Sequence, residues 1–305
     1  MNIIDACSVR SFSTIIYNIC SKSPIGNFFS RREILPYLLH FINFYVKPFE
    51  HFGSRLLLRI GFYNMRVTYI YHSCYLIEFG SFSVIFDYYK DAIREDGTTW
   101  VNDYLLGKEE DLYVLCTHSH SDHFNPEILT WKERKKNITY IFSHDLLSTG
   151  KSAGADAVYL RKEERYSDRH IRLKAFGSTD EGGSFLLEWN NLRIFHAGDL
   201  NNWHWNEEVA KEESLSYENN FLCELELLAE ESDRLDLVMF PVDPRLGSDY
   251  MKGASQFISR IGVHYFLPMH FGEQYEKANR FEMEAERNGV VYLPLSHPGQ
   301  SFDLE

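Results

Sequence analysis

The stretch DLYVLCTHSHSDHFNP, residues 111–126, contains the pattern that decides the fold. Its first six residues are a nearly continuous apolar run, which is typical of a buried strand. Asn125–Pro126 at its end is a signal for the start of a helix. Between strand and helix lie three histidines and one aspartate, namely His118, His120, Asp122 and His123. Because the chain has only 13 histidines in 305 residues, three of them within six positions at a strand end indicate a functional site.

The spacing within this segment favours metal binding. In an extended backbone, side chains two residues apart point the same way, so His118 and His120 can bind one ion. Asp122 and His123 lie in the turn beyond and can face a second ion. Asp122 is also the candidate catalytic residue, either as a ligand or as the base that orients a water molecule. Imidazole together with carboxylate suits zinc, and also iron or manganese.

The rest of the chain from Met65 onward predicts alternating elements. The β-rich runs 66–71, 74–79 and 82–87 are separated by very short turns and predict a meander. Later strands are predicted at 138–142, 157–160, 170–176, 183–189, 192–195, 235–240, 264–269 and, closing the chain, 290–293. Helices are predicted after Pro126, within 206–234, near 248–261 and over 273–288. A meander followed by strands that alternate with helices indicates an α/β sandwich with its helices outside.

The charge balance changes abruptly at Met65. Residues 1–64 contain seven Lys/Arg and three Asp/Glu, whereas residues 65–305 contain 24 and 41. We therefore expect two unlike pieces, with the functional domain in residues 65–305. Residues 1–64 would be an extension of unknown role, either an arm that packs on the body or on a membrane surface, or a product of a misassigned start. The acidic body would repel phosphate backbones, which argues against nucleic acid as a partner.

The composition excludes other classes of protein. With 44% hydrophobic and 25% charged residues, the chain is neither disordered nor a coiled-coil rod. The most apolar stretch, 35–46, is interrupted by His40 and Asn43 and is shorter than the roughly 20 residues that a bilayer requires, so no membrane span is predicted. The five cysteines lack CxxC spacing, and no signal peptide is evident, so we expect a cytoplasmic protein. The sequence does not determine the oligomeric state, and a homo-oligomer is possible.

The HSHSDH segment resembles the HxHxDH signature of the metallo-β-lactamase fold superfamily, and the resemblance extends over about residues 66–300. FHAGD at 195–199 resembles the second signature, and PMHF at 268–271 resembles the last. The spacings are most similar to the branch that includes the L-ascorbate-6-phosphate lactonases. The resemblance implies a four-layered αββα sandwich, here with an extra N-terminal segment, and one or two divalent metal ions, zinc before manganese or iron. It makes Asp199 the bridging ligand and His270 the last ligand of the second metal.

One departure from the family pattern concerns a further histidine ligand. Related sequences place it between the first two signatures, at a position that falls near Gly177 in this chain. The chain has no histidine there. Asp180 is the best replacement by position, His196 is the next candidate, and His144 is a third. A weakened first site would bind metal less tightly or with a different preference.

Five residues near these motifs are candidates for substrate binding. They are His72 in the turn YHSC, Trp203 and His204 after the second signature, and Asp243 and Arg245 in PVDPR after a predicted strand. Each has a structural alternative. His72 could be an ordinary turn residue, and the Trp–His pair could pack on the following helix. Asp243 and Arg245 could hold a ligand in place or simply pair with each other.

Together these features predict a metal-dependent hydrolase that uses a metal-activated water on a small ester, lactone or phosphorylated metabolite. No GxSxG motif or phosphate-binding loop is present in the sequence. The main alternative is a non-catalytic or weakly active metal-binding scaffold. The absence of the usual histidine ligand favours this alternative. An iron-dependent redox protein would need a flavin partner segment that the sequence lacks. A nuclease is disfavoured by the acidic body.

Overall fold

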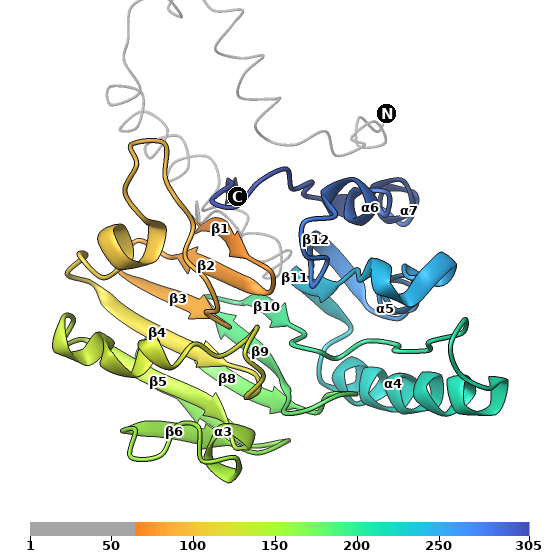
Figure 1. Ribbon diagram of the computed structural model, residues 1–305, viewed down its shortest axis with the longest axis horizontal. Helices are drawn as coiled ribbons and strands as arrows, with labels where there is room; N and C mark the ends of the chain where they lie inside the picture. Colours follow the sequence, from red (N-terminus) through yellow and green to blue (C-terminus); the bar gives the residue numbers. More distant parts are fainter. Residues whose placement is uncertain (1–64, 305) are drawn as a thin grey trace, which may run out of the picture. The chain divides into compact units, whose positions relative to one another are not determined.

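Two seven-stranded sheets make up the centre of the computed structural model, which describes residues 65–304 (Figure 1). The predicted extension, residues 1–64, lies outside the described residues, so the division into two pieces remains a prediction. Within the described residues, no helix is long and apolar enough to cross a bilayer.

The first sheet has the order β14-β1-β2-β3-β4-β5-β6. Its strands are β1 (Met65–Tyr71), β2 (Cys74–Glu78), β3 (Phe82–Phe86), β4 (Asp111–Cys116), β5 (Ile138–Ser143), β6 (Ala157–Leu160) and β14 (Ser301–Leu304). The predicted meander is present, because β1, β2 and β3 pair antiparallel in sequence order. From β3 to β6 the pairing is parallel, so these strands end at the same edge.

The second sheet has the order β13-β12-β11-β10-β9-β8-β7. Its strands are β7 (Arg165–Ser167), β8 (Arg172–Phe176), β9 (Ser184–Trp189), β10 (Leu192–His196), β11 (Arg234–Pro241), β12 (Gly262–Met269) and β13 (Val291–Tyr292). Pairing is antiparallel from β7 to β10 and parallel from β10 to β13. Each sheet therefore has one parallel half, whose carboxyl ends are open for functional residues.

Helices form the two outer layers. They are α3 (Asp145–Ser148), α4 (Lys211–Glu231), α5 (Lys252–Arg260), α6 (Tyr275–Asn279) and α7 (Glu282–Arg287), with a π-helical turn at Trp100–Leu105 and 3-10 helices at Pro126–Glu133 and Pro244–Asp249. The helices α4, α5 and α6 contact strands of the second sheet, whereas α3 contacts β5 of the first (Figure 1). The predicted αββα sandwich is confirmed.

Alternation along the strands explains why their sequences are apolar throughout. On β2, Tyr75 and Ile77 belong to the core that includes the second sheet's residues, whereas Cys74 and Leu76 belong to the core under the outer helices. Successive side chains of a strand point to opposite faces, and here both faces are buried. The continuous apolar runs of the sequence are thus inner strands of a layered protein.

Two sequence predictions for the C-terminal region were wrong. The helix expected over 273–288 is broken into α6 and α7, with Arg280 and Phe281 between them. The strand near 290–293 does not close the chain, because β14 follows it and pairs with β1 in the other sheet. The turn dipeptide Pro298–Gly299 and the polar–apolar alternation of Ser301–Leu304 were signals for β14 that the sequence interpretation missed. The helix after Asn125 is a 3-10 helix, and it packs through the buried Trp131.

We expect the contact between α4 and the second sheet to be a major source of stability. Phe221 on α4 is fully buried and lies 6.2 Å from the ring of Phe240 on β11. Phe221→Ala should lower the free energy of unfolding by about 3–5 kcal/mol. Leu222→Ala, one position along the same helix and 37% exposed, should lower it by less than about 1 kcal/mol. Urea unfolding followed by circular dichroism measures both, and equal losses would contradict this packing.

Candidate metal centre

Seven histidine and aspartate side chains come together where the loops leave the two sheets. His118 and His120 follow β4 and meet Asp199, which follows β10. The possible ligand atoms of these three residues all lie within 4.8 Å of one another.

A second group with the same spacing consists of His72, Asp122, His123 and His270. Asp199 lies between the groups, because its oxygens are 3.3 Å from His118 Nε2 and 3.1 Å from His123 Nε2. His270 Nε2 is 3.4 Å from the same carboxylate. The structure thus brings together the residues of the three sequence signatures.

Unpaired atoms show what this arrangement can hold. Among the described residues, five buried atoms here have no hydrogen-bond partner, namely Nε2 of His72, His118, His123 and His270 and Oδ1 of Asp199. An unsatisfied buried polar group costs about 1–3 kcal/mol, so such atoms are rare in native proteins. Imidazole nitrogens and carboxylate oxygens directed at one another are the ligands of zinc, iron and manganese. The donor set therefore fits divalent metal ions.

Asp87, the residue after β3, holds His123 in position. Its carboxylate is fully buried and accepts hydrogen bonds from the backbone N and Oγ1 of Thr117, each at 2.7 Å. It also lies 2.8 Å from His123 Nδ1, which turns Nε2 of that ring toward Asp199. Burial raises the pKa of Asp87, but His196 and His123 outweigh burial, so this pKa lies below its ordinary value. Sequence reasoning missed Asp87, although its place directly after a buried strand beside β4 was a usable signal.

Asp243 plays the same part for His270. Its Oδ2 lies 2.9 Å from His270 Nδ1 and accepts hydrogen bonds from Arg245 at 2.8 and 2.6 Å. Burial raises the pKa of Asp243, but its bonds to His270 and Arg245 outweigh burial and lower it. Of the roles considered for Asp243 and Arg245, the geometry therefore favours orientation of a ligand.

The charges of the centre favour a cation between the two groups. Burial raises the pKa of Asp199, but His123 and His270 outweigh burial and bring it well below its usual range. Burial lowers the pKa of His123, but Asp199 and Asp87 raise it to about 10. The His72 imidazole, 3.4 Å from its carboxylate, holds the pKa of Asp122 well below its usual range. The carboxylates of the centre are therefore ionised and need positive charge beside them.

Close backbone approaches and unusual backbone angles support the centre. Gly198 has φ +54°, and a Cβ there would lie 2.7 Å from the carbonyl oxygen of Gly183, so only glycine fits. His72 and His270 also adopt left-handed φ angles of 58° and 63°, and their rings lie 4.3 Å apart. Non-glycine residues in this region occur mostly where the surrounding structure holds them for a function.

Within residues 65–304, carboxylates and no further histidine face the open side of His120. Asp180 Oδ2 lies 4.0 Å from His120 Nδ1, and Glu181 Oε2 lies 3.6 Å from His120 Nε2. All three side chains are exposed by 41–53%. At Gly177, a Cβ would meet the carboxylate of Glu224 on α4 at 2.3 Å, so a side chain there would have to displace the end of Glu224.

The two histidines considered as replacement ligands lie elsewhere. His196 stacks on Phe86 with ring centres 4.7 Å apart, its Nε2 lies 2.8 Å from the carbonyl oxygen of Ser73, and its Nδ1 accepts from Gly198 N. Both of its nitrogens are therefore engaged by backbone. His144 Nε2 accepts a hydrogen bond from Arg161.

Trp203 and His204 are buried beneath the centre. The indole Nε1 of Trp203 donates to the carbonyl oxygen of Asp199 at 2.7 Å, and its ring lies edge-on to His270 at 5.5 Å. His204 is fully buried, with one nitrogen 3.2 Å from Asp249 O and the other accepting from Asn206 N. The geometry favours aromatic packing over a direct substrate contact for this pair.

Comparisons with known proteins show the family to which the chain belongs. Residues 66–270 match the family model described as a beta-lactamase superfamily domain, so the chain belongs to this superfamily. A protein of Nanoarchaeum equitans named a UPF0173 metal-dependent hydrolase is 24% identical over 251 residues, which cover 76% of this chain and 97% of that protein. The predicted superfamily is thereby confirmed, and the predicted enzyme class is the one for which this relative is named.

Solved structures share the fold. Igni18, a metallo hydrolase from Ignicoccus hospitalis, matches with a TM-score of 0.58 and 16% identity, over 79% of this chain and 99% of that one. CmlA, a diiron β-hydroxylase from Streptomyces venezuelae, matches with a TM-score of 0.57 and 14% identity, over 79% of this chain and 54% of that one. The closer placement beside the L-ascorbate-6-phosphate lactonases remains a prediction.

Asp87→Asn should weaken metal binding by about 10- to 100-fold, because His123 would lose the carboxylate that orients it. Asp91→Asn is a matched control, since Asp91 accepts bonds from the backbone of Val101 and Asn102 in a neighbouring loop. The measurement is a competition titration against a chelator of known affinity. Unchanged affinity in Asp87→Asn would mean that this carboxylate has no part in orienting the ligand.

Proposed function

We propose that the chain is a metal-dependent hydrolase that acts on a small ester, lactone or phosphorylated metabolite. The observation that carries this proposal is the convergence of buried, unpaired imidazole nitrogens on the Asp199 carboxylate. The names of the relatives support the class of enzyme, and the substrate class is our own inference.

The two groups divide the ligands between two ions. His118 and His120 would hold the first ion, with Asp180 as the replacement for the missing histidine and Glu181, whose carboxylate lies nearer to His120, as the alternative. Asp122, His123 and His270 would hold the second, and Asp199 would bridge both. His72 joins the second group, because its unpaired Nε2 lies 3.4 Å from Asp122 Oδ2.

The two ion positions differ in accessibility. The histidines of the second group are largely or fully buried, whereas the His120 side chain is 41% exposed and faces solvent-exposed carboxylates. Catalytic metal sites keep an open position for water and substrate, and structural ones are closed. We therefore place the reaction on the His120 side. Zinc is our first choice of metal, with iron or manganese as alternatives because oxygen ligands on this side suit them.

The residues around this position can handle the proton of hydrolysis. Bound divalent ions would lower the pKa of a water toward neutrality and polarise the substrate oxygen. Asp122 is 42% exposed, so it would serve either as a ligand of the second ion or as the group that orients the attacking water. His72 lies behind Asp122 and holds it in that orientation. Asp87 and Asp243 fix the rings of His123 and His270 from the far side.

An activity screen tests the proposal. Full-length protein reconstituted with zinc, manganese or iron should hydrolyse at least one member of a panel of esters, lactones and phosphate esters. A chelator should remove this turnover, and added metal should restore it. Metal that binds tightly without turnover of any panel member would favour the scaffold alternative. The cytoplasm remains our predicted location for the protein.

His120→Ala should remove about one metal ion per chain and lower turnover by more than about 100-fold. Loss of a residue that only orients a metal ligand costs about 10- to 100-fold, and loss of the ligand itself should cost more. Metal analysis of the purified protein and the rate on the best panel substrate measure the two effects. His297→Ala, which changes an exposed histidine near the C-terminus, should leave both unchanged. Full metal content and full activity in His120→Ala would refute the site assignment.

Asp180→Asn should weaken binding of the more weakly held ion by about 10-fold, with little effect on the tighter one. Glu181→Gln is the comparison, because its carboxylate lies at a similar distance from His120. Stepwise metal titration resolves the two ions. A larger effect of Glu181→Gln would mean that Glu181 is the replacement ligand. No effect of either substitution would mean that neither side chain replaces the missing histidine and that water fills the ligand position.

A further inference from the structure

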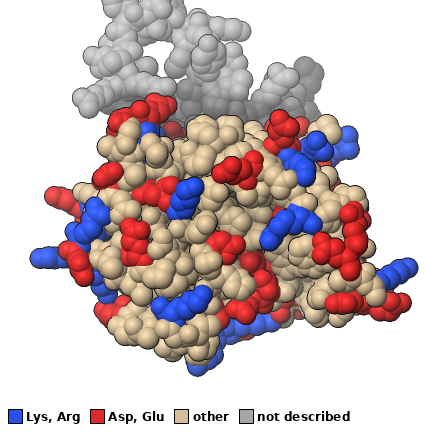
Figure 2. All heavy atoms as spheres, in the orientation of Figure 1, with Lys and Arg blue, Asp and Glu red and all other residues tan. Residues whose placement is uncertain are grey.

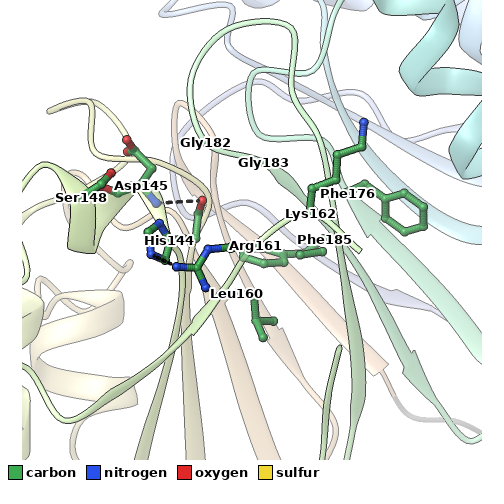
Figure 3. A pocket seen from close by; sticks show the side chains of 12 residues that line it. His144, Asp145, Ser148, Leu160, Arg161, Lys162, Phe176, Gly182, Gly183 and Phe185 are labelled. Atoms are coloured by element: carbon green, nitrogen blue, oxygen red, sulfur yellow. Dashed lines mark hydrogen bonds between the residues drawn. The ribbon is translucent and has the colours of Figure 1, made fainter. Parts of the chain in front are cut away.

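We infer that a cavity beside the metal centre binds an anionic group of the substrate, a carboxylate or a phosphate. The cavity has a volume of about 300 Å³ and lies between the ends of β5 and β6 in the first sheet and the β8–β9 segment of the second (Figure 3). Ligand pockets in proteins span about 300–1,000 Å³, so this one suits a small group. The inference rests on the proposed function, because it names part of the molecule that would be hydrolysed.

Two walls of the cavity are attached to the segment that carries the metal ligands. Gly182 lines it, and a Cβ on Gly182 would lie 2.1 Å from the carbonyl oxygen of Thr117 and 2.4 Å from His118 Cβ. Asp145 lines the opposite wall, and its Oδ2 accepts a hydrogen bond from Ser119 N at 2.7 Å. The cavity is therefore separated from the segment 117–119 only by these two residues of its lining.

The lining of the cavity is mainly polar. Its polar side chains are Ser143, His144, Asp145, Ser148, Arg161 and Lys162, whereas Leu160, Phe176 and Phe185 are buried. The Arg161 side chain extends from the end of β6 toward His144 (Figure 3).

Arg161 has a cationic group without a carboxylate at contact distance. Its Nη2 donates to His144 Nε2 at 2.6 Å, and the ion pair with Glu164 is 3.9 Å long. By contrast, Arg165 and Arg172 reach carboxylates within 2.9 Å.

The other charged groups of the cavity are already engaged. Lys162 pairs with Glu224 at 2.6 Å, and the carboxylate of Asp145 is bonded to Ser119 N. Basic and acidic side chains are interspersed over the visible face of the molecule (Figure 2).

The chemistry of Arg161 defines the ligand class. A guanidinium group binds carboxylate and phosphate through two parallel hydrogen bonds, and its bond to His144 holds the plane of the group. The substrate is therefore an ester or lactone with an anionic group a few bonds from the carbonyl that is attacked. A neutral ester would lose this contact and bind less tightly.

Binding of two probes, benzoate and phenyl phosphate, tests the cavity without turnover. Calorimetry on the metal-reconstituted full-length protein should detect binding of at least one, and Arg161→Gln should weaken it by about 10- to 100-fold. Arg161→Lys keeps the positive charge but cannot form two parallel hydrogen bonds, so it should weaken probe binding less than Arg161→Gln does. Arg172→Gln is the control, because Arg172 is similarly exposed, at 66% against 63%, and lies outside this cavity. Any direct contact of a probe with metal is the same in all variants.

Kinetics on two esters supply the second measurement. Arg161→Gln should raise the KM for monophenyl glutarate by about 10- to 100-fold with kcat within about twofold, and leave phenyl acetate unaffected. Unchanged probe affinity in Arg161→Gln, or no binding of either probe to the unmodified protein, overturns the inference, even if esters are hydrolysed. Weakened probe binding in a protein that hydrolyses no ester supports the anion site and refutes only the proposed function. The tighter of the two probes identifies carboxylate or phosphate as the group bound.

Discussion

The Asp199 carboxylate, buried among the imidazoles of His118, His123 and His270, is the constraint on which the structure of the centre depends. A buried carboxylate is costly unless positive charge or hydrogen-bond donors surround it. Here one of its oxygens has no hydrogen bond, although three ring nitrogens lie within 3.4 Å. Metal ions bound between these groups would supply the positive charge, and metal binding would then stabilise this edge of the fold.

In each sheet, residues at the ends of two neighbouring strands hold a histidine of the centre in position. Asp87 follows β3 and supports His123, which lies in the loop after the adjacent strand β4. Asp243 follows β11 and supports His270 directly after the adjacent strand β12. The same device thus occurs once in each sheet: a carboxylate from one parallel strand fixes a histidine from the next. Because parallel strands end at one edge, short loops suffice to bring the residues together.

The sequence predicted the residues of the centre well where the signal was local. The cluster at 117–123 lies in one loop after one strand, and strand runs such as 111–116 and 157–160 match the observed bounds. It failed where the environment comes from distant parts of the chain. His196 is engaged by Ser73 and Phe86, more than a hundred residues away, so its sequence position beside Asp199 was misleading. Likewise, the space at Gly177 is determined by Glu224 on α4.

The pairing of β14 with β1 has a consequence for association between molecules. β14 is the edge strand of its sheet, only four residues long, and its Asp303 forms an ion pair with Arg66. Beneath it, β1 has the sequence MRVTYIY, rich in β-branched and aromatic residues and with a single charge. An uncovered strand of this kind is a template for pairing with other chains. The short strand β14 therefore occupies the edge of β1 that could otherwise pair with another chain.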